Sequence, residues 1–324
     1  MKIVITGAGG FIGSHVVETA LERGHDVTAL VHYNSNGSWG FLENSSHKNS
    51  PHLSVQLGDV TDRGQMDNLV TGADVILHLA ALIGIPYSYQ APNSYVQTNI
   101  IGTLNMLQAA QRAQTSRIVI TSTSEVYGSA QYVPIDEKHP LQGQSPYSAS
   151  KIGADKLAES YYCSFDLPVV TLRPFNTYGP RQSARAIIPT ILSQALQGAD
   201  TIKLGNLSPK RDLTFVKDTA KAFLLAAETP NIEGEVIHFG QGKSVTMGEL
   251  AQTCLDVVGS SAQIVSQADR MRPEKSEVQH LECDARKAHQ LLGWQPDFSL
   301  AAGLEACADY TRQNLHLYKA AYNV

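Results

Sequence analysis

The N-terminal stretch of the chain constrains its fold most strongly. Residues 2–6, KIVIT, form a β-branched run; GAGGFIG follows, and SHVVETALERG then carries apolar residues at helical spacing. Gly7, Gly10 and Gly13 give the pattern GxxGxxG, close to the fingerprint in which glycines let the backbone approach a pyrophosphate at a helix N-terminus. The same glycines could form an ordinary tight turn. The strand and the helix on either side favour a dinucleotide site.

The next three predicted strands end in residues that could line the same site. DVTALV is followed by His32 and then YN, with neither the Asp typical of NAD sites nor an Arg for NADP, so both cofactors stay open. LSVQLG leads to Asp59 and Val60, a pair placed to touch an adenine, although Asp59 could equally cap the following helix. VILHL ends in Ala80 and Ala81, which are small enough for a cofactor to pass.

The stretch from residue 118 to Lys151 carries the residues that could perform chemistry. A buried strand, RIVIT, ends in a run of hydroxyls and one acid, residues 121–125, at the sheet edge where ligands bind in open parallel sheets. Ser145 and Pro146 then predict a helix start, and Tyr147 and Lys151 follow four residues apart on one face. An ammonium beside a phenol favours phenolate, which could act as a base near neutral pH. A lone YxxxK pair is also common by chance.

Composition excludes several classes of protein. The formal net charge of -5, with acids and bases interspersed, predicts no nucleic-acid partner. The four cysteines lie far apart without a CxxC, which favours reduced thiols in the cytoplasm over a disulfide frame or a metal site. Met1 leads directly into a strand, so we expect no signal peptide, and no apolar run reaches the length of a membrane span.

The 324 residues suit one large α/β domain and a smaller lobe. We expect a Rossmann-type doubly wound parallel sheet with a smaller C-terminal α/β substrate lobe. Residues 1–175 would form the dinucleotide-binding domain, with 210–238 returning to it, and 176–209 with 239–324 would form the lobe. Residues 82–95, which include Tyr87, carry aromatic and hydroxyl groups suited to a sugar, although core packing explains the tyrosines nearly as well.

The ordered set of motifs resembles the extended short-chain dehydrogenase/reductases that modify nucleotide sugars. The set comprises GAGGFIG, Asp59-Val60, STSEVYG at 122–128, Tyr147 with Lys151, and RPFNTYGP at 173–180, and the resemblance covers essentially the whole chain. Within this family, Thr123-Ser124-Glu125 is similar to the Thr-Ser-Glu of GDP-mannose 4,6-dehydratases and UDP-glucuronate decarboxylases. The segments YNSNGSWG and NTYGPRQSARAIIPT are similar to the NAD-dependent 4,6-dehydratases of the legionaminic-acid pathway.

The resemblance implies a set of site residues. The implied catalytic residues are Thr123, Ser124, Glu125, Tyr147 and Lys151, where Ser124 departs from the Asp of dTDP-glucose 4,6-dehydratases. The implied cofactor-binding residues are Gly7, Gly10, Phe11, Ile12, Gly13, His32, Asp59, Val60, Leu79, Ala80, Ala81 and Asn99, again with Tyr147 and Lys151. The implied substrate-binding residues are Tyr87, Asn176, Arg185, Lys203, Arg211 and Arg272; Asn176, Arg211 and Arg272 would hold the diphosphate.

The implied activity is 4,6-dehydration of UDP- or GDP-N-acetylglucosamine with tightly held NAD or NADP, NAD being favoured slightly. The alternatives are UDP-glucuronate decarboxylation, for which Arg185 could face the C6 carboxylate, and 4-epimerisation, in which Glu125 would have no catalytic role. A non-catalytic dinucleotide-binding sensor is the alternative from a different class. The resemblance also implies a homodimer that pairs the helices after Tyr95 and Tyr147.

Overall fold

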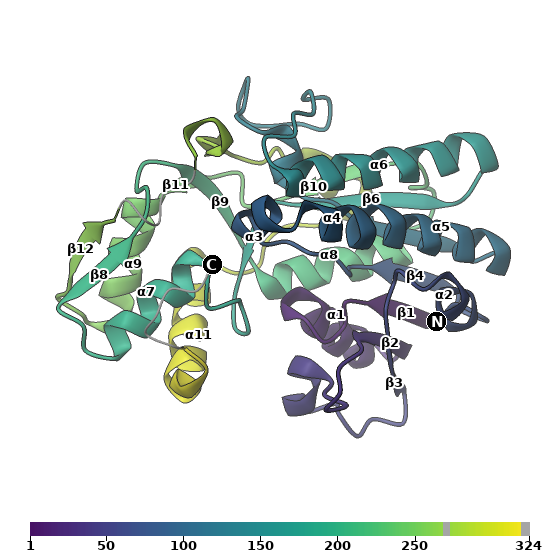
Figure 1. Cartoon of the computed structure of the whole chain (residues 1–324), viewed down its shortest axis with the longest axis horizontal. Helices are drawn as coiled ribbons and strands as arrows, with labels where there is room; N and C mark the ends of the chain where they lie inside the picture. Colours follow the sequence, from purple (N-terminus) through teal and green to yellow (C-terminus); the bar gives the residue numbers. More distant parts are fainter. Residues whose placement is uncertain (268–272, 319–324) are drawn as a thin grey trace.

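The computed structural model describes residues 1–267 and 273–318 of the chain. A larger domain is built on a seven-stranded parallel sheet, and a smaller lobe lies beyond the C-terminal ends of its strands (Figure 1). The order of the strands in the larger sheet is β10-β6-β5-β4-β1-β2-β3. Their bounds are β1 (Lys2–Thr6), β2 (Asp26–His32), β3 (Leu53–Gly58), β4 (Val75–His78), β5 (Arg117–Thr121), β6 (Val169–Pro174) and β10 (Val236–Phe239). This order confirms the predicted Rossmann-type sheet.

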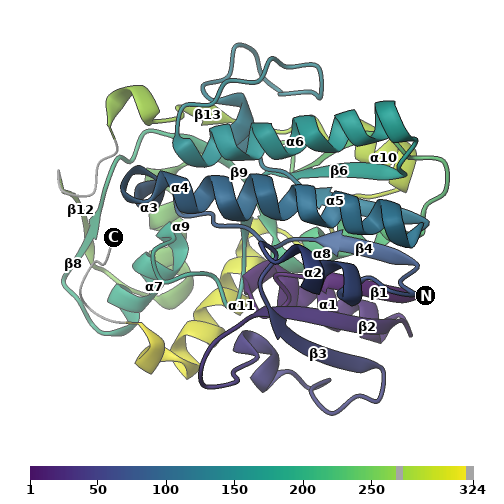
Figure 2. The ribbon, with the colours of Figure 1, turned by 45° about the vertical axis from the view of Figure 1, so that its right-hand side comes forward.

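Helices cover both faces of the larger sheet (Figure 2). One face packs against α1 (Phe11–Glu22), α8 (Val216–Glu228) and α10 (Arg286–Leu292). The other face packs against α2 (Arg63–Leu69), α5 (Gly102–Ala113) and α6 (Pro146–Phe165). Because both faces are buried, the central strands β1, β4 and β5 are nearly continuous apolar runs, whereas the edge strand β3, LSVQLG, alternates.

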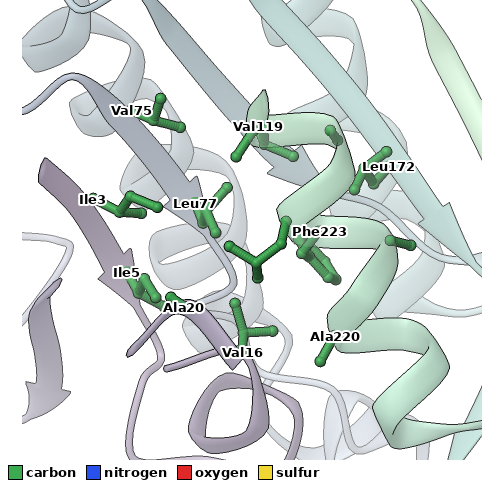
Figure 3. Close-up of a cluster of buried hydrophobic side chains, with 14 of the residues drawn as sticks. Ile3, Ile5, Val16, Ala20, Val75, Leu77, Val119, Leu172, Ala220 and Phe223 are labelled. Carbon is green, nitrogen blue, oxygen red and sulfur yellow. The ribbon is translucent and has the colours of Figure 1, made fainter. Parts of the chain in front are cut away.

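Alternate residues of one strand enter different cores. Ile3 and Ile5 of β1 point toward α1 and α8, whereas Val4 points toward the helices of the opposite face. Figure 3 shows the first of these cores, where Phe223 of α8 lies among side chains of the sheet. Burying a side chain of this size contributes roughly 1.5–3 kcal/mol. These contacts fix the carboxyl edge of the sheet, where the predicted site lies.

Within the described residues, the smaller lobe contains two short sheets and three α-helices. Strand β9 (Lys210–Phe215) pairs with β7 (Asn176–Tyr178), β11 (Ser244–Thr246) and β13 (His280–Leu281), while β8 (Thr201–Leu204) pairs with β12 (Gln263–Ser266). Helices α7 (Ile187–Leu196), α9 (Met247–Val258) and α11 (Leu300–Gln313) enclose a separate apolar core. Short 3-10 turns span Gly40–Asn44, Ser124–Tyr127, Glu274–Ser276 and Leu315–Leu317.

The chain returns to the larger domain later than the predicted residue 210. Strand β9 belongs to the sheet of the smaller lobe, and the return begins with α8 at Val216 and ends with β10. Helix α10, in the range assigned to the lobe, packs against α8 and β10 of the larger domain. Alternating strands and helices do not reveal which sheet a strand joins, so the pattern of the sequence could not place this boundary.

Asp212 of β9 ties three backbone segments of the smaller lobe together. Its Oδ1 accepts the N–H of Gln241 at 2.7 Å, and its Oδ2 accepts the N–H groups of Gly242 at 2.9 Å and Cys283 at 3.1 Å. Burial raises the pKa of Asp212 to about 6, against the opposing effect of these three donors. The carboxylate is fully buried, so the bonds are shielded from water.

Replacing this carboxylate by an amide should destabilise the lobe. In Asp212→Asn, one amide oxygen can keep at most two of the donors, and the NH₂ group then faces the third, so we expect a loss of about 2 kcal/mol. A lowered urea midpoint measured by circular dichroism would show it. Asp256→Asn is the control, because Asp256 is exposed and its carboxylate accepts a hydrogen bond from the Gln252 side chain instead of from buried backbone N–H groups. An equal midpoint in the two variants would contradict the anchoring role.

Candidate active site

Helix α6 carries the predicted Tyr147 and Lys151 into the interior of the protein. The helix begins at Pro146, and Ser145 caps it by accepting the N–H of Ser148, in a capping box. The residues Tyr147 and Lys151 are 7% and 4% exposed, so both face the interior of the protein. The predicted helix start is therefore confirmed, and the cap sets which face of the first turn is buried.

The 3-10 turn Ser124–Tyr127, which follows β5, places two of the predicted residues beside Tyr147. The Thr123 side chain hydrogen-bonds the Tyr147 phenol and also accepts the backbone N–H of Glu125 at 3.2 Å. The Glu125 carboxylate lies close enough to raise the pKa of Tyr147. Ser124, by contrast, is 2% exposed and packs inside the turn. Phenol, hydroxyl and carboxylate thus meet at the end of one strand.

Burial controls the protonation of the phenol and of the ammonium. It raises the pKa of Tyr147, while the Thr123 hydrogen bond lowers it and the charges of Glu125 and Asp155 raise it. Burial likewise lowers the pKa of Lys151, against the opposing charge of Asp155. The pKa of Tyr147 is therefore raised, whereas the expected effect of Lys151 would lower it, because the loss of water is the largest influence on the phenol. A further positive charge at the site would favour the phenolate.

The turn after β1 has the form that a dinucleotide pyrophosphate needs. Gly7 has a φ of +69°, and a Cβ there would lie 2.8 Å from the backbone N of Ala80. A Cβ on Gly13 would lie 2.1 Å from the carbonyl oxygen of Gly7, so helix and turn touch directly. Helix α1 starts after Gly10 without a side-chain cap, at Phe11 and Ile12, which are half-buried. Its first N–H groups are therefore available to an anion.

The predicted adenine end of the cofactor site lies beyond β2 and β3. The His32 side chain is 81% exposed and its Nδ1 lies 3.8 Å from Asp59 Oδ2. Asp59 Oδ1 accepts the backbone N–H and the hydroxyl of Thr61, and the cap of α2 is Asp62 instead. Val60 is buried against α5. The alternative in which Asp59 caps the helix is thus wrong, and its second oxygen points toward His32.

The end of β4 is held by buried polar side chains. Thr6 Oγ1 accepts the N–H of Ala80 at 3.1 Å and bonds the buried His78 ring at 2.8 Å. Leu79, Ala80 and Ala81 line the same edge, half-buried. The side-chain amide of Asn99, in the π-helix Val96–Ile101, bonds both the N–H and the C=O of Leu82. Asn99 would therefore influence a bound cofactor indirectly, by fixing the position of the loop at Leu82.

Sequence reasoning placed Tyr95 in the segment 82–95 that is suited to a sugar, but it assigned only Tyr87 of that segment to the site. Helices α3 (Ile85–Gln90) and α4 (Pro92–Tyr95) carry Tyr87 and Tyr95, and the Tyr95 ring lies 6.2 Å from both the Tyr87 and the Tyr147 rings. Its hydroxyl donates to the Gly84 carbonyl at 2.5 Å, and a Cβ on Gly84 would lie 3.8 Å from Arg185 Nη2. The repeated tyrosines of residues 82–95 were the available signal. They form one aromatic wall beside the phenol, and Arg185 stands next to it.

The remaining predicted substrate residues are spread over the smaller lobe. Asn176 begins β7, and its Oδ1 is buried without a hydrogen bond in the described structure. Arg211 on β9 is buried and lies 3.5 Å from Glu277. Lys203 is exposed on β8, and no described contact joins it to Tyr147 or Arg211. Arg272 lies outside the described residues.

Two classes of feature are absent from residues 1–267 and 273–318. That part of the chain has no cluster of His, Cys, Asp and Glu able to hold a metal ion. None of its helices combines the length and the apolar character needed to cross a bilayer.

Comparisons with known proteins agree with this geometry. The family model described as GDP-mannose 4,6 dehydratase matches residues 4–307. A dTDP-glucose 4,6-dehydratase from Actinoplanes sp. is 34% identical over 320 residues, covering 97% of this chain and 98% of that protein. DesIV, the dTDP-glucose 4,6-dehydratase from Streptomyces venezuelae, solved with NAD, has a TM-score of 0.87 at 30% identity and covers 98% of this chain and 99% of its own.

Relatives with other activities match as well. UDP-glucuronic acid 4-epimerase from Bacillus cereus, solved with NAD, has a TM-score of 0.88 at 29% identity and covers 97% of this chain and 99% of its own. Further curated relatives carry the names of a 4-epimerase and a decarboxylase. All of these proteins act on nucleotide sugars by name. The chain therefore belongs to the nucleotide-sugar dehydratase and epimerase family of the extended short-chain dehydrogenase/reductases.

Proposed function

We propose that the protein is a nucleotide-sugar 4,6-dehydratase that acts on UDP- or GDP-N-acetylglucosamine. One observation supports this choice within the family: the Glu125 carboxylate lies near enough to the Tyr147 phenol for its charge to raise the pKa of that phenol. A 4-epimerase needs only a base for the C4 hydroxyl, whereas dehydration needs a second base for the C5 proton.

The proposed cofactor is a nicotinamide dinucleotide, with NAD favoured over NADP. The uncapped helix start and the Gly7 turn fit a pyrophosphate, and the residues from the last position of β2 onward, HYNSN, include no Lys or Arg for a 2′-phosphate. The bound ring would supply the hydride acceptor and, when oxidised, the positive charge that favours a Tyr147 phenolate.

In the proposed mechanism, Tyr147 takes the proton of the C4 hydroxyl as the C4 hydrogen leaves as hydride. Thr123 holds the phenol by its hydrogen bond, and Lys151 keeps a positive charge nearby. The resulting C4 ketone makes the C5 proton acidic, Glu125 removes it, and water leaves from C6. A bound nicotinamide would accept the C4 hydride and donate it to C6, and with a solvent-derived proton added at C5 the product would be a 4-keto-6-deoxy sugar. Glu125 or a neighbouring group protonates the leaving hydroxyl.

Arg185 favours a second candidate that shares the first step. Its guanidinium lies against Gly84 and the Tyr95 wall, where it could meet the C6 carboxylate of a uronate. The C4 ketone of a uronate is a β-keto acid, which loses carbon dioxide readily. Decarboxylation of UDP-glucuronate is therefore the competing activity, and simple 4-epimerisation is the third.

Incubation with separate nucleotide sugars tests these activities. We expect UDP- or GDP-N-acetylglucosamine to lose one water, and UDP-glucuronate to be unchanged, by mass spectrometry. Loss of carbon dioxide from UDP-glucuronate would instead establish the decarboxylase, and C4 inversion without a mass change would establish the epimerase. Binding of NAD without conversion of any sugar would support a non-catalytic sensor.

We also propose that the protein is a homodimer. Helices α5 and α6 run side by side, and Val96, Tyr162 and Phe165 near this pair of helices are exposed. Burying such side chains against a second copy is favourable. Light scattering should give twice the mass of one chain at micromolar concentration. A mass of one chain would contradict the proposal.

A further inference from the structure

A buried ionic network continues the catalytic face of α6. Asp155 lies one turn beyond Lys151 on the same face and is 6% exposed. Its Oδ2 accepts the Ser122 hydroxyl at 2.6 Å and Arg173 Nη2 at 2.7 Å. Its Oδ1 is buried and has no hydrogen bond in the described structure. One oxygen is therefore fixed by two donors, whereas no described donor fixes the other.

Arg173 itself is fixed from a second side. Its Nη1 donates to the Tyr127 hydroxyl, and its guanidinium carbon lies 4.9 Å from the centre of the Tyr127 ring. The Arg173 Nε also donates to Ser122 Oγ at 3.1 Å. The network thus sets the position of the Asp155 carboxylate, and a carboxylate this rigid exerts a fixed field on its neighbours.

Lys151 is the neighbour that depends on this field. Burial lowers the pKa of Lys151, and Asp155 raises it. The other titratable group that faces Lys151 is His78 of β4, whose own pKa is lowered to about 3 by burial and by Lys151, so this ring is neutral. Tyr147 lies one turn earlier on α6 and is faced by Glu125 and Tyr95. Among these groups, Asp155 is the negatively charged residue that lies nearest to Lys151 along helix α6.

We propose that Asp155 is a positioning residue whose carboxylate, held by Ser122 and Arg173, keeps Lys151 as an ammonium beside Tyr147. The inference rests on the proposed function, because it assigns to Lys151 the role of the cation in the Tyr147 proton step. The alternative is that the pair of Asp155 and Arg173 only braces α6 against β6. The positioning role predicts that the ionisation of Lys151 changes when Asp155 is replaced, whereas the bracing role predicts that it does not.

The ionisation of Lys151 can be measured without any sugar. Protein labelled with carbon-13 at the lysine ε position gives one NMR signal for each lysine, and Lys151→Arg identifies the signal of Lys151. We expect the titration midpoint of Lys151 to fall by about one pH unit or more in Asp155→Asn. Asp155→Glu should restore most of the difference. A midpoint within about 0.2 units of wild type in Asp155→Asn would overturn the proposal.

Arg173→Gln provides a test of opposite sign. It removes the cation that offsets Asp155, so the Lys151 midpoint should rise although this variant also loses the brace. A purely structural role predicts no such pair of opposite shifts. If Asp155→Asn does not fold, Arg173→Gln decides alone, and an unchanged or lower midpoint overturns the proposal. Asp67→Asn, which breaks an exposed pair with Arg112, is the control and should leave the midpoint unchanged.

The catalytic consequence appears in the first chemical step. The rate of reduced-cofactor formation should fall at high pH in both proteins. In Asp155→Asn this fall should begin at a lower pH than in wild type, because Lys151 loses its proton sooner. Dehydratase, decarboxylase and epimerase share this step, so the result does not depend on which product forms. A uniform loss of rate at every pH, with the Lys151 midpoint unchanged, would leave only the bracing role and overturn the proposal.

Discussion

Tyr147→Phe should abolish turnover while the protein stays folded. The hydroxyl is the group proposed to take the C4 proton, and its removal leaves that step without its assigned base, so we expect a loss of roughly a thousandfold in rate. Tyr147 packs with Ile85 and Tyr95, and phenylalanine preserves that packing. The measurements are the rate of reduced-cofactor formation in a single turnover, and circular dichroism for folding.

Tyr161→Phe is the matched control on the same helix. Tyr161 is 9% exposed, and its ring packs against Phe165 at 5.0 Å, away from the site. This variant should turn over at close to the wild-type rate. If Tyr147→Phe retains a rate within a few fold of wild type, Tyr147 is not the base.

The pH dependence of the wild-type enzyme should report the same group. Burial raises the pKa of Tyr147, and the active form is the deprotonated one, so the rate of C4 oxidation should increase with pH until Tyr147 is ionised.

The fold and the centre of the site could be predicted because their signals are local. The glycine turn, the strand ends and the capped start of α6 each follow from a few neighbouring residues, and the structure places Thr123, Glu125 and Tyr147 together. The resemblance to a family supplied the order of the motifs. It did not fix the substrate, since relatives of similar identity differ in activity.

Features that depend on distant contacts could not be predicted. Asp155 is an ordinary helical acid in the sequence, and its role emerges only when β5 and β6 bring Ser122 and Arg173 to it. Tyr95 required the fold of residues 82–95 before its ring could be placed against Tyr147. The sequence likewise could not show which sheet β9 joins, because strand pairing is a long-range property.

Glu125→Gln should separate the first chemical step from the second. The amide keeps the size of the side chain and the backbone N–H bond to Thr123, but it cannot take the C5 proton. The charge of Glu125 raises the pKa of Tyr147, so its removal should not impair C4 oxidation. We expect reduced cofactor to form and persist, with dehydration slowed about a hundredfold or more.

Exchange of the C5 hydrogen with solvent deuterium measures the second step directly. Wild type should incorporate deuterium at C5, and Glu125→Gln should not. Glu159→Gln is the control, because Glu159 is exposed on α6 and pairs only with Lys156 at 2.5 Å among its ionic contacts in the described chain. Continued exchange in Glu125→Gln would assign the C5 proton to another base. Loss of both C4 oxidation and C5 exchange would show that Glu125 assists the Tyr147 proton step instead. A base used only at C5 acts after the ketone has formed, so its removal would leave C4 oxidation intact.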